Sequence, residues 1–267
     1  MNEPLLLRLP DEASLRQMFH RRYGPQRALG WGPRLRQRCG YYTPDDVYES
    51  LVAGLVVKGM SWLDVGCGRE LFPNNLGLAE ILSKRCQHLT GVDPDPTLAE
   101  NPWVDEKVQG GIDGFDGEGR FDLVTMRMVA EHIADPMACT KSIARALRPG
   151  GLAVVFTVAG MSPMPLLTRL APMGLRHVVK SWLWGTQPKD TFPTCFKMNS
   201  RAVLQRQFAA VGMKEEAFLR LDDCRTFAKF QAMSKLEMAL LRACRAVGVP
   251  YPEHCLLGVY RKQMPRS

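Results

Sequence analysis

The sequence predicts an α/β protein built on a doubly wound, largely parallel sheet, and three observations indicate this class. Between residues 61 and 158, short apolar runs typical of buried strands alternate with longer segments that have the apolar spacing of helices. The first run, 62–65, is followed at once by the turn Gly66-Cys67-Gly68, and a later run ends on Asp93. Ligands of open α/β sheets bind at the carboxyl ends of the strands, so we expect a cofactor here.

The start of the first core helix has the clearest local signals. Thr43 is a suitable N-cap, Pro44 fits the first helical position, and acidic residues follow in the first turn. We expect this helix to continue to about residue 58. The other helices are expected at residues 75–86, 135–147 and 200–211, and the other strands at 88–93, about 107–108, 121–126, 152–158, 217–221 and 255–262.

The chain divides into four parts. Residues 1–43 are expected to form a lid over the cofactor, or a surface arm that packs on the core. Residues 44–158 form the cofactor-binding core. Residues 159–199 are too long for an ordinary loop and rich in Pro, Met and Trp, so we expect a helical cap that forms much of the substrate pocket, with a plain structural insert as the alternative. Residues 200–267 complete the core and carry an amphipathic helix.

Composition limits the classes of protein further. The 267 residues have a net charge of +8, but the basic residues are spread out, which favours a solvated basic face over nucleic-acid binding. No apolar run is long enough to span a membrane and no signal peptide is evident, so we expect a cytoplasmic protein. None of the eight cysteines forms Cys-x-x-Cys, which favours buried thiols over a metal site or disulfides. The oligomeric state stays open.

The glycine turn fits two cofactor classes. A dinucleotide fold needs a third glycine, but Leu71 stands at that position, and the Glu70 carboxylate would repel a pyrophosphate. S-adenosylmethionine carries no phosphate, and Asp64 can pair with its cationic amino group. The turn therefore favours S-adenosylmethionine, with a nicotinamide-dependent oxidoreductase as the alternative.

From about residue 45 to 160, and more weakly to the C-terminus, the chain resembles the class I S-adenosylmethionine-dependent methyltransferases, and within them the type 11 methyltransferase-domain group. Six motifs in order carry the resemblance: Leu-Asp-Val-Gly-Cys-Gly (63–68), Gly-Val-Asp (91–93), Gly-Ile-Asp (111–113), Phe-Asp-Leu-Val (121–124), Glu-His-Ile (131–133) and Leu-Arg-Pro-Gly-Gly (147–151). The resemblance implies a Rossmann-like sheet of seven strands, mostly parallel, with an antiparallel C-terminal edge strand. Glu70 departs from the family, which usually has a third glycine there.

The resemblance also implies which residues bind S-adenosylmethionine. Asp93 is expected to hold the ribose hydroxyls, since an ionised carboxylate can accept both hydrogen bonds, and Asp113 to lie near the adenine. Residues 127 and 128 follow the fourth strand and are expected to border the cofactor. The expected cofactor-binding residues are Asp64, Gly66, Cys67, Gly68, Asp93, Pro94, Ile112, Asp113, Arg127 and Met128.

The expected activity is methyl transfer to a small-molecule acceptor that is apolar, aromatic or lipid-like. His132 lies just beyond the fourth strand and is the candidate general base, which slightly favours an oxygen acceptor. Glu131 could orient His132 or point away, and a purely structural role for both is the alternative. The expected substrate-binding residues are Tyr42, Trp182, Trp184, Phe192 and Phe196, although Tyr42 could equally pack in the core. A non-catalytic protein that binds the cofactor is a further alternative.

Residues 226–247 combine an apolar stripe with basic residues. The stripe consists of Phe227, Phe230, Leu236, Leu240 and Cys244, and Lys229, Lys235, Arg242 and Arg245 lie among the polar positions. Such a helix can lie on a membrane surface or cover the sheet or cap. We favour packing and keep a weak membrane contact as the alternative.

Overall fold

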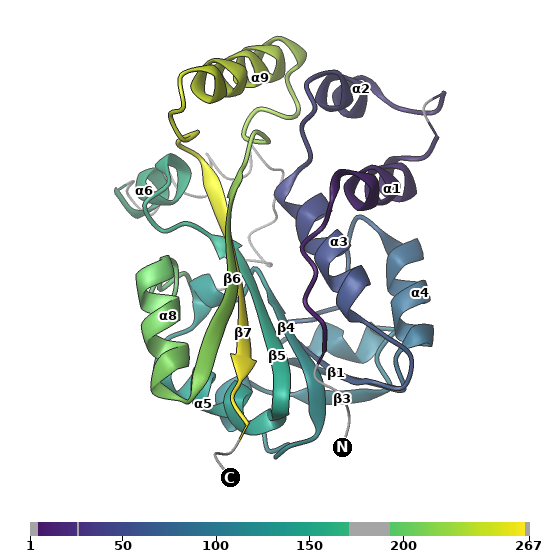
Figure 1. The fold of residues 1–267 in the computed structure, drawn as a ribbon, viewed down its shortest axis with the longest axis vertical. Coiled ribbons are helices and arrows are strands. Elements are labelled where there is room, and N and C mark those ends of the chain that lie inside the picture. Colours follow the sequence, from purple (N-terminus) through teal and green to yellow (C-terminus); the bar gives the residue numbers. More distant parts are fainter. Residues whose placement is uncertain (1–4, 26, 171–192, 265–267) are drawn as a thin grey trace.

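The computed structural model describes residues 5–25, 27–170 and 193–264. A seven-stranded sheet forms its centre, with the strand order β3-β2-β1-β4-β5-β7-β6 (Figure 1). The strands are β1 (Ser61–Val65), β2 (His88–Asp93), β3 (Glu106–Gln109), β4 (Phe121–Arg127), β5 (Leu147–Val158), β6 (Met213–Asp222) and β7 (His254–Lys262). The expected seven-stranded, doubly wound sheet is therefore confirmed.

The strand order reverses between β1 and β4. β1 pairs in parallel with β2 on one side and with β4 on the other, so the carboxyl ends of all three lie at one edge of the sheet. The C-terminal strand β7 is antiparallel, as expected, and lies one position in from the edge, which β6 forms. The point of reversal is where this type of sheet opens a crevice for a ligand.

β5 begins earlier than the sequence predicts. We expected a turn at residues 147–151 and a strand only from residue 152. Leu147 already pairs with Phe121, and the register then shifts so that Leu152 pairs with Leu123. The segment between the two pairs is an irregularity within the strand, because four residues of β5 lie opposite a single residue of β4.

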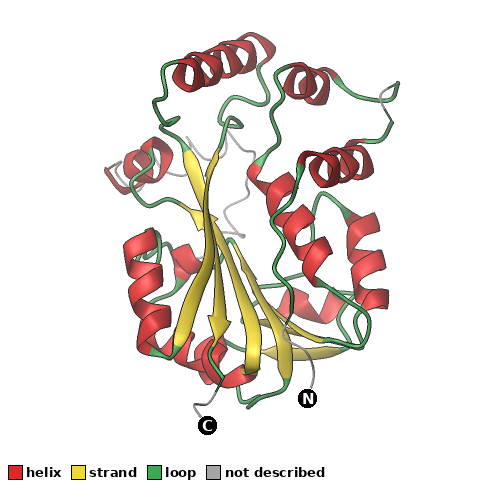
Figure 2. Ribbon diagram, in the orientation of Figure 1, coloured by secondary structure: helices red, strands yellow, loops and turns green. Residues whose placement is uncertain are grey.

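Helices cover both faces of the sheet (Figure 2). In one apolar cluster α3 (Pro44–Leu55) and α4 (Leu76–Arg85) pack on Trp62, and in the other α5 (Pro136–Ala146) and α8 (Arg201–Ala210) pack on Leu63. Trp62 and Leu63 are consecutive residues of β1 and both are fully buried, because side chains alternate between the two faces of a strand. β1 is thus buried on both sides, as the apolar run predicted.

The start of α3 has the capping arrangement that the sequence predicts. The Thr43 side chain accepts a hydrogen bond from the backbone N–H of Asp46, and the Asp46 carboxyl accepts one from the N–H of Thr43. Pro44 occupies the first turn. The two reciprocal bonds satisfy backbone donors that the helix itself leaves unpaired.

Three helices gather at the carboxyl end of the parallel strands (Figure 1). α1 (Glu12–Tyr23) and α2 (Trp31–Arg38) form the segment expected as a lid, and α9 (Gln231–Ala246) packs against α2. Tyr41 ties this end of the molecule together, because its hydroxyl donates to the carbonyl of Asp222 and accepts from the N–H of Cys224. Whether α1 and α2 open and close over a cofactor stays a prediction.

The expected cap is described only in part. α6 (Pro163–Leu170) begins it and residues 193–199 end it. Trp182, Trp184 and Phe192, three of the expected substrate-binding residues, lie outside the described residues. Among the helices that the structure describes, none combines the length and the apolar character that crossing a membrane requires.

Candidate active site

The turn after β1 needs glycine for two reasons. Gly66 and Gly68 have φ angles of 75° and 47°, in the left-handed region that side chains disfavour. A Cβ atom on Gly66 would also lie 2.1 Å from Cγ2 of Val129. The backbone N–H of Gly66 donates to the carbonyl of Val92 at 2.8 Å, which joins the turn to the end of β2.

Two side chains fix the shape of this turn. Asp93, at the end of β2, accepts hydrogen bonds from the N–H groups of Gly68 and Asp95, both at 2.8 Å. Asn101 is fully buried, and its Nδ2 donates to the carbonyl oxygens of Gly68 at 3.0 Å and Cys67 at 3.4 Å. No sequence pattern singles out Asn101, because one asparagine in a turn after a strand has many possible roles.

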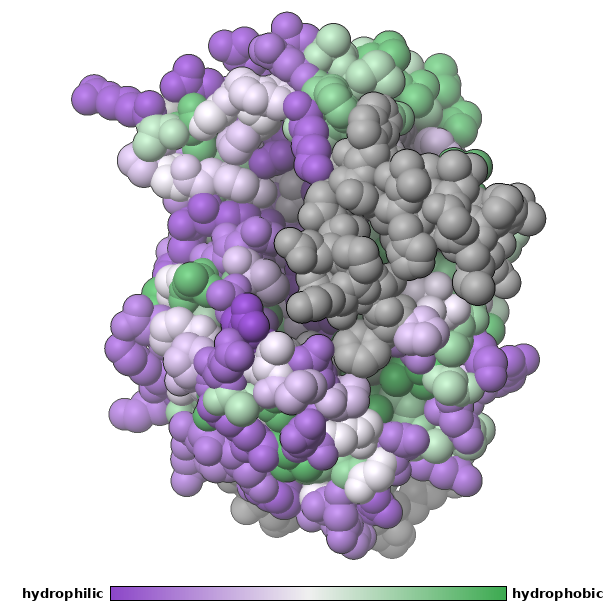
Figure 3. Space-filling model, turned by 180° about the vertical axis from the view of Figure 1, so that it is seen from behind, coloured by the Kyte–Doolittle hydropathy of each residue, from purple (hydrophilic) through white to green (hydrophobic). Residues whose placement is uncertain are grey.

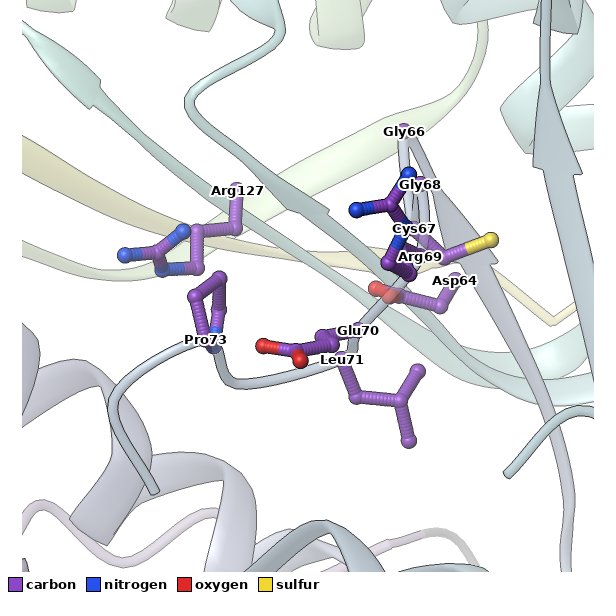
Figure 4. A pocket seen from close by; sticks show the side chains of 9 residues that line it. All are labelled: Asp64, Gly66, Cys67, Gly68, Arg69, Glu70, Leu71, Pro73 and Arg127. Carbon is purple, nitrogen blue, oxygen red and sulfur yellow. The ribbon is translucent and has the colours of Figure 1, made fainter. Parts of the chain in front are cut away.

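A cavity of about 360 Å³ opens beside the turn (Figure 4). Its volume falls within the range of about 300–1,000 Å³ that small-molecule sites occupy. The residues that line it are Asp64, Gly66, Cys67, Gly68, Arg69, Glu70, Leu71, Pro73 and Arg127. Five of the expected cofactor-binding residues therefore meet at one cavity, together with four that we had not assigned.

Asp64 is the buried carboxyl group of this cavity. The register of β1 and β4 places Thr125 opposite Asp64, and the Thr125 hydroxyl donates to Oδ1 of Asp64. Trp62 in turn donates from Nε1 to the Thr125 oxygen at 2.6 Å. Burial raises the pKa of Asp64 to about 7, although the Thr125 hydrogen bond and the charge of Arg127 oppose the rise. Asp64 is thus poised between its neutral and ionised forms near neutral pH.

Two cationic side chains line the cavity: Arg69 is largely exposed and pairs with Glu100, whereas Arg127 is more buried and is held in place by Asp45. Nη2 and Nε of Arg127 donate to Oδ1 of Asp45, and Arg225 donates to the other oxygen. Arg225 also binds both oxygens of Asp223. Burial opposes ionisation of Asp45, but the charges of Arg225 and Arg127 outweigh it and hold the pKa of Asp45 well below its usual range. The site therefore joins α3, the end of β4 and the segment after β6.

The other expected cofactor-binding residues lie around the cavity without lining it. Met128 has a φ of 52°, and its N–H donates to the carbonyl of Phe156 at 2.7 Å. Pro94 is exposed, and Ile112 is buried in the apolar cluster beneath α5. The exposed Asp113 turns its carboxyl group back toward the Cα atom of Gly111. Their contacts with a cofactor stay predictions.

Cys67 contributes its backbone to the site, and its thiol faces elsewhere. A Cβ atom on Gly91 would lie 2.5 Å from Sγ of Cys67, so the thiol packs against the backbone of β2. Figure 4 shows the sulfur turned away from the Asp64 and Glu70 carboxyl groups. Burial raises the pKa of this thiol, which makes it a poor nucleophile.

Glu131 and His132 lie in the 3-10 turn Ala130–His132 that follows β4. The buried Glu131 carboxyl accepts from the hydroxyl of Thr157 at 2.7 Å, and its backbone carbonyl accepts from the N–H groups of Cys195 and Phe196. Glu131 thus anchors the end of the cap segment. Nδ1 of His132 lies 3.0 Å from the carbonyl oxygen of Pro193, which assigns the proton to Nδ1 and makes Nε2 the basic nitrogen.

Two expected substrate-binding residues are described. The half-buried Tyr42 ring meets the ring of Phe19 edge to face, with centroids 6.2 Å apart, so Tyr42 packs against α1. Phe196 has a φ of 51°, and apart from Met128 it is the one non-glycine residue in the described ranges with a positive φ. Both strained residues flank the Glu131–His132 turn, and strained backbone often marks functional sites.

The residues present fit S-adenosylmethionine. Its amino-acid head carries a carboxylate and an ammonium group, and the cavity presents the Arg127 guanidinium together with the carboxyl groups of Asp64 and Glu70. Asp93 keeps acceptor capacity for ribose hydroxyls, because a carboxylate has about four lone-pair positions and only two N–H groups use them here. Within the described ranges, no three His, Cys, Asp or Glu side chains come together as a metal site would require.

Comparison with known proteins gives the family. A family model described as a methyltransferase domain matches residues 44–215, which is more than half of the chain. The chain therefore belongs to this methyltransferase family. The class expected from the sequence, a class I S-adenosylmethionine-dependent methyltransferase, is confirmed at this level, and so is S-adenosylmethionine as the cofactor of the family. The nicotinamide alternative is thereby excluded.

Individual relatives share about 30% identity with this chain over a little more than half of its length. The chain is similar to a ubiquinone biosynthesis O-methyltransferase of Xanthomonas campestris pv. campestris, with 29% identity over 154 residues, which are 54% of this chain and 61% of that protein. The protein of the same name from Xanthomonas oryzae pv. oryzae is 31% identical over 150 residues, covering 52% of this chain and 59% of its own length. The match thus spans about three fifths of these relatives.

Solved structures agree on the fold. An S-adenosylmethionine-dependent methyltransferase from Mesorhizobium loti has a TM-score of 0.51 and 20% identity, and the match covers 77% of this chain and 92% of that one. At this level of identity the likeness supports the fold alone.

Proposed function

We propose that this protein transfers the methyl group of S-adenosylmethionine to an oxygen atom of an apolar or aromatic small molecule. The observation that carries the proposal is that Asp64 and Arg127 line the same cavity, directly beside the glycine turn. An ionised carboxylate and a guanidinium at one cavity suit the ammonium and carboxylate groups in the zwitterionic head of S-adenosylmethionine. When bound, this cofactor supplies a methyl group on a positively charged sulfur.

The chain's own residues orient the cofactor. Asp93 and Asn101 hold the glycine turn in a fixed shape, so the turn needs little reorganisation when the cofactor binds. Asp45 holds the Arg127 side chain. We assign to these four residues the binding part of the reaction.

We further propose that His132 accepts the proton of an acceptor hydroxyl at Nε2. The hydrogen bond between Nδ1 and the carbonyl of Pro193 supports this assignment, because the neutral ring then carries its proton on Nδ1 and Nε2 can accept one. Glu131 is then a positioning residue, since its carboxyl and carbonyl groups bind Thr157 and the backbone of residues 195 and 196. The name of the Xanthomonas relatives favours oxygen as the methylated atom.

The acceptor class rests on the composition of the expected cap, which is apolar and aromatic. A hydroxyl group on an aromatic or lipid-like molecule fits both the cap and His132. The cytoplasmic location expected from the sequence stays part of this proposal. A protein that binds the cofactor without turnover is the second candidate, because the binding residues alone do not require catalysis.

Two measurements test the proposal in sequence. Calorimetric titration with S-adenosylmethionine and with S-adenosylhomocysteine should give micromolar binding, and Asp93→Ala should weaken it by roughly 1.5–3 kcal/mol, the usual contribution of hydrogen bonds to a charged group. Failure of both ligands to bind would reject the cofactor assignment. Labelled methyl donor should then label phenolic acceptors, and His132→Ala should lower kcat by about 10²–10⁴-fold. Turnover unchanged in His132→Ala would return this residue to a structural role.

A further inference from the structure

α9 presents an apolar stripe to solvent. Met233, Leu236 and Leu240 are 40%, 64% and 49% exposed, and Val247, directly after the helix, is 73% exposed. Their spacing of three, four and seven residues places them on one face of the helix. The space-filling view shows an apolar surface at this end of the molecule, at the upper right of Figure 3. The expected packing of Leu236 and Leu240 is therefore wrong.

The opposite face of α9 holds the helix on the protein. Ser234, Glu237, Met238 and Leu241 are buried there, and Met238 and Leu241 share an apolar cluster with Tyr41. The exposed stripe is thus not needed to attach α9. Substitutions in it are expected to leave the fold intact.

The charges on α9 are one-sided. Its single acidic residue, Glu237, is buried, and its carboxyl accepts hydrogen bonds from the N–H groups of Thr226 and Phe227. Lys235 and Arg242 are exposed and, seven residues apart, lie on one side of the helix and two turns from each other. On α9, all of whose residues the structure describes, every exposed charge is therefore positive. A helix with an exposed apolar stripe and exclusively positive exposed charges is complementary to an anionic bilayer, into which it would bury its leucines.

α6 adds apolar surface at the same end of the molecule. Met161 and Leu167 are 73% and 58% exposed. The start of α6 is fixed to the segment that follows α9, because the Glu253 carboxyl accepts from the N–H of Met164 and the Ser162 hydroxyl contacts His254. Figure 1 shows α9 beyond the upper ends of β6 and β7, and α6 to the left of these strands.

We propose that the exposed face of α9 docks this protein on a bilayer with anionic headgroups. A second copy of the chain is a poorer occupant, since a two-fold contact through α9 places two helices against each other whose exposed charges are all positive. The proposal rests on this surface alone, so its test is independent of the catalytic assignment. If the acceptor is lipid-like, docking here brings the cap to the membrane that contains it.

Vesicle sedimentation of the full chain tests the proposal, with phosphatidylcholine vesicles that do or do not contain phosphatidylglycerol. The wild type should sediment with the anionic vesicles only. L236Q/L240Q should lower the partition coefficient by about tenfold or more, because two leucines no longer enter the interface. K235Q/R242Q should also weaken binding, by several-fold.

Matched variants separate the α9 face from general effects. L76Q/I81Q replaces two exposed apolar residues of α4, and K141Q/R206Q removes two exposed positive charges elsewhere; both should bind as the wild type does. The melting temperature of each variant verifies folding. Equal vesicle binding by L236Q/L240Q and the wild type would overturn the proposal. The proposal would also be overturned if K141Q/R206Q weakened vesicle binding as much as K235Q/R242Q does. Absence of vesicle binding combined with concentration-dependent dimers that L236Q/L240Q abolishes would assign the face to a second copy instead.

Discussion

Arg127 donates two hydrogen bonds to a single oxygen of Asp45, from Nη2 at 2.7 Å and from Nε at 3.2 Å. Asp45 lies in the first turn of α3, and Arg127 ends β4, 82 positions later. The other oxygen of Asp45 binds Arg225, which follows β6. One buried carboxylate therefore sets the position of the cationic wall of the cavity and ties the C-terminal part of the chain to it.

Asp45→Asn should weaken both cofactor binding and stability. Asparagine presents an amide NH₂ group where one of the arginines needs an acceptor, so a charged hydrogen bond is lost, at a cost of roughly 1.5–3 kcal/mol. Because Arg127 loses its fixed position, we expect the affinity for S-adenosylmethionine to fall by about tenfold. This change corresponds to about 1.4 kcal/mol of binding free energy. Calorimetry and thermal unfolding measure the two effects. The exposed Asp116→Asn serves as the control, and a Kd unchanged in Asp45→Asn would contradict this role of the carboxylate.

Asp64 should make cofactor binding depend on pH. Burial raises the pKa of Asp64 to about 7, whereas a bound ammonium group favours the ionised form, so binding releases a proton below that pH. Affinity should fall by up to tenfold per pH unit below about pH 6, where Asp64 of the free protein is protonated. Titrations in buffers of different ionisation enthalpy measure the released proton directly. A flat profile between pH 5 and 8 would show that Asp64 does not change its ionisation on binding.

Asp64→Asn separates binding from stability. Between about pH 4 and 7 the folded protein holds a proton on Asp64 that the unfolded chain has released, so this residue favours folding at low pH and the contribution is lost as pH rises through 7. Asparagine resembles the protonated form at every pH. At pH 8 the variant should therefore be at least as stable as the wild type, while its affinity falls and no longer depends on pH. A large loss of stability at pH 8 would indicate that the carboxylate has a structural role instead.

The parts of the site that the sequence predicted are those set by local geometry. Gly66 and Gly68 have positive φ angles that the turn requires, and Asp93 ends a strand beside them. Thr43 caps its helix through residues three positions away. Each depends on a few neighbouring residues, so a pattern in the sequence is enough to locate it.

The parts that the sequence missed depend on residues far apart in the chain. Thr125 meets Asp64 only through the register of two strands, and Arg225 reaches Asp45 across 180 positions. Asn101 supports the glycine turn from beyond β2. Hydrogen bonds of this kind leave no periodic pattern. The outward face of α9 was misread for a related reason, because periodicity identifies an apolar face but not the direction in which tertiary packing turns it.

Gly66→Ala should abolish cofactor binding. The alanine Cβ would lie 2.1 Å from Cγ2 of Val129 at a φ of 75°, so the turn must move or the side chain must adopt a strained conformation. Gly77→Ala is a matched control inside α4, where a Cβ meets no atom within 4 Å; it should stabilise the helix by about 0.5–1 kcal/mol. Melting temperatures and calorimetric titration compare the two. Normal binding by Gly66→Ala would mean that the turn adapts and that its shape is not what recognises the cofactor.

Asn101→Ala should loosen the glycine turn without changing any group that lines the cavity. The substitution leaves the carbonyl oxygens of Gly68 and Cys67 without their buried donor and removes the acceptor of the Trp103 N–H. An unsatisfied buried group costs about 1–3 kcal/mol, so the melting temperature should fall by several degrees.

The readout that identifies a positioning role is local to the turn. The amide of Gly68 donates to Asp93, and its hydrogen exchange should accelerate in Asn101→Ala relative to amides in the middle of β4. S-adenosylmethionine should bind more weakly than a uniform loss of stability explains, and saturating cofactor should restore part of the protection at Gly68. The exposed Asn74→Ala is the control and should change neither quantity. Uniform acceleration across the sheet, with affinity unchanged, would mean that Asn101 supports the core as a whole and not the cofactor turn.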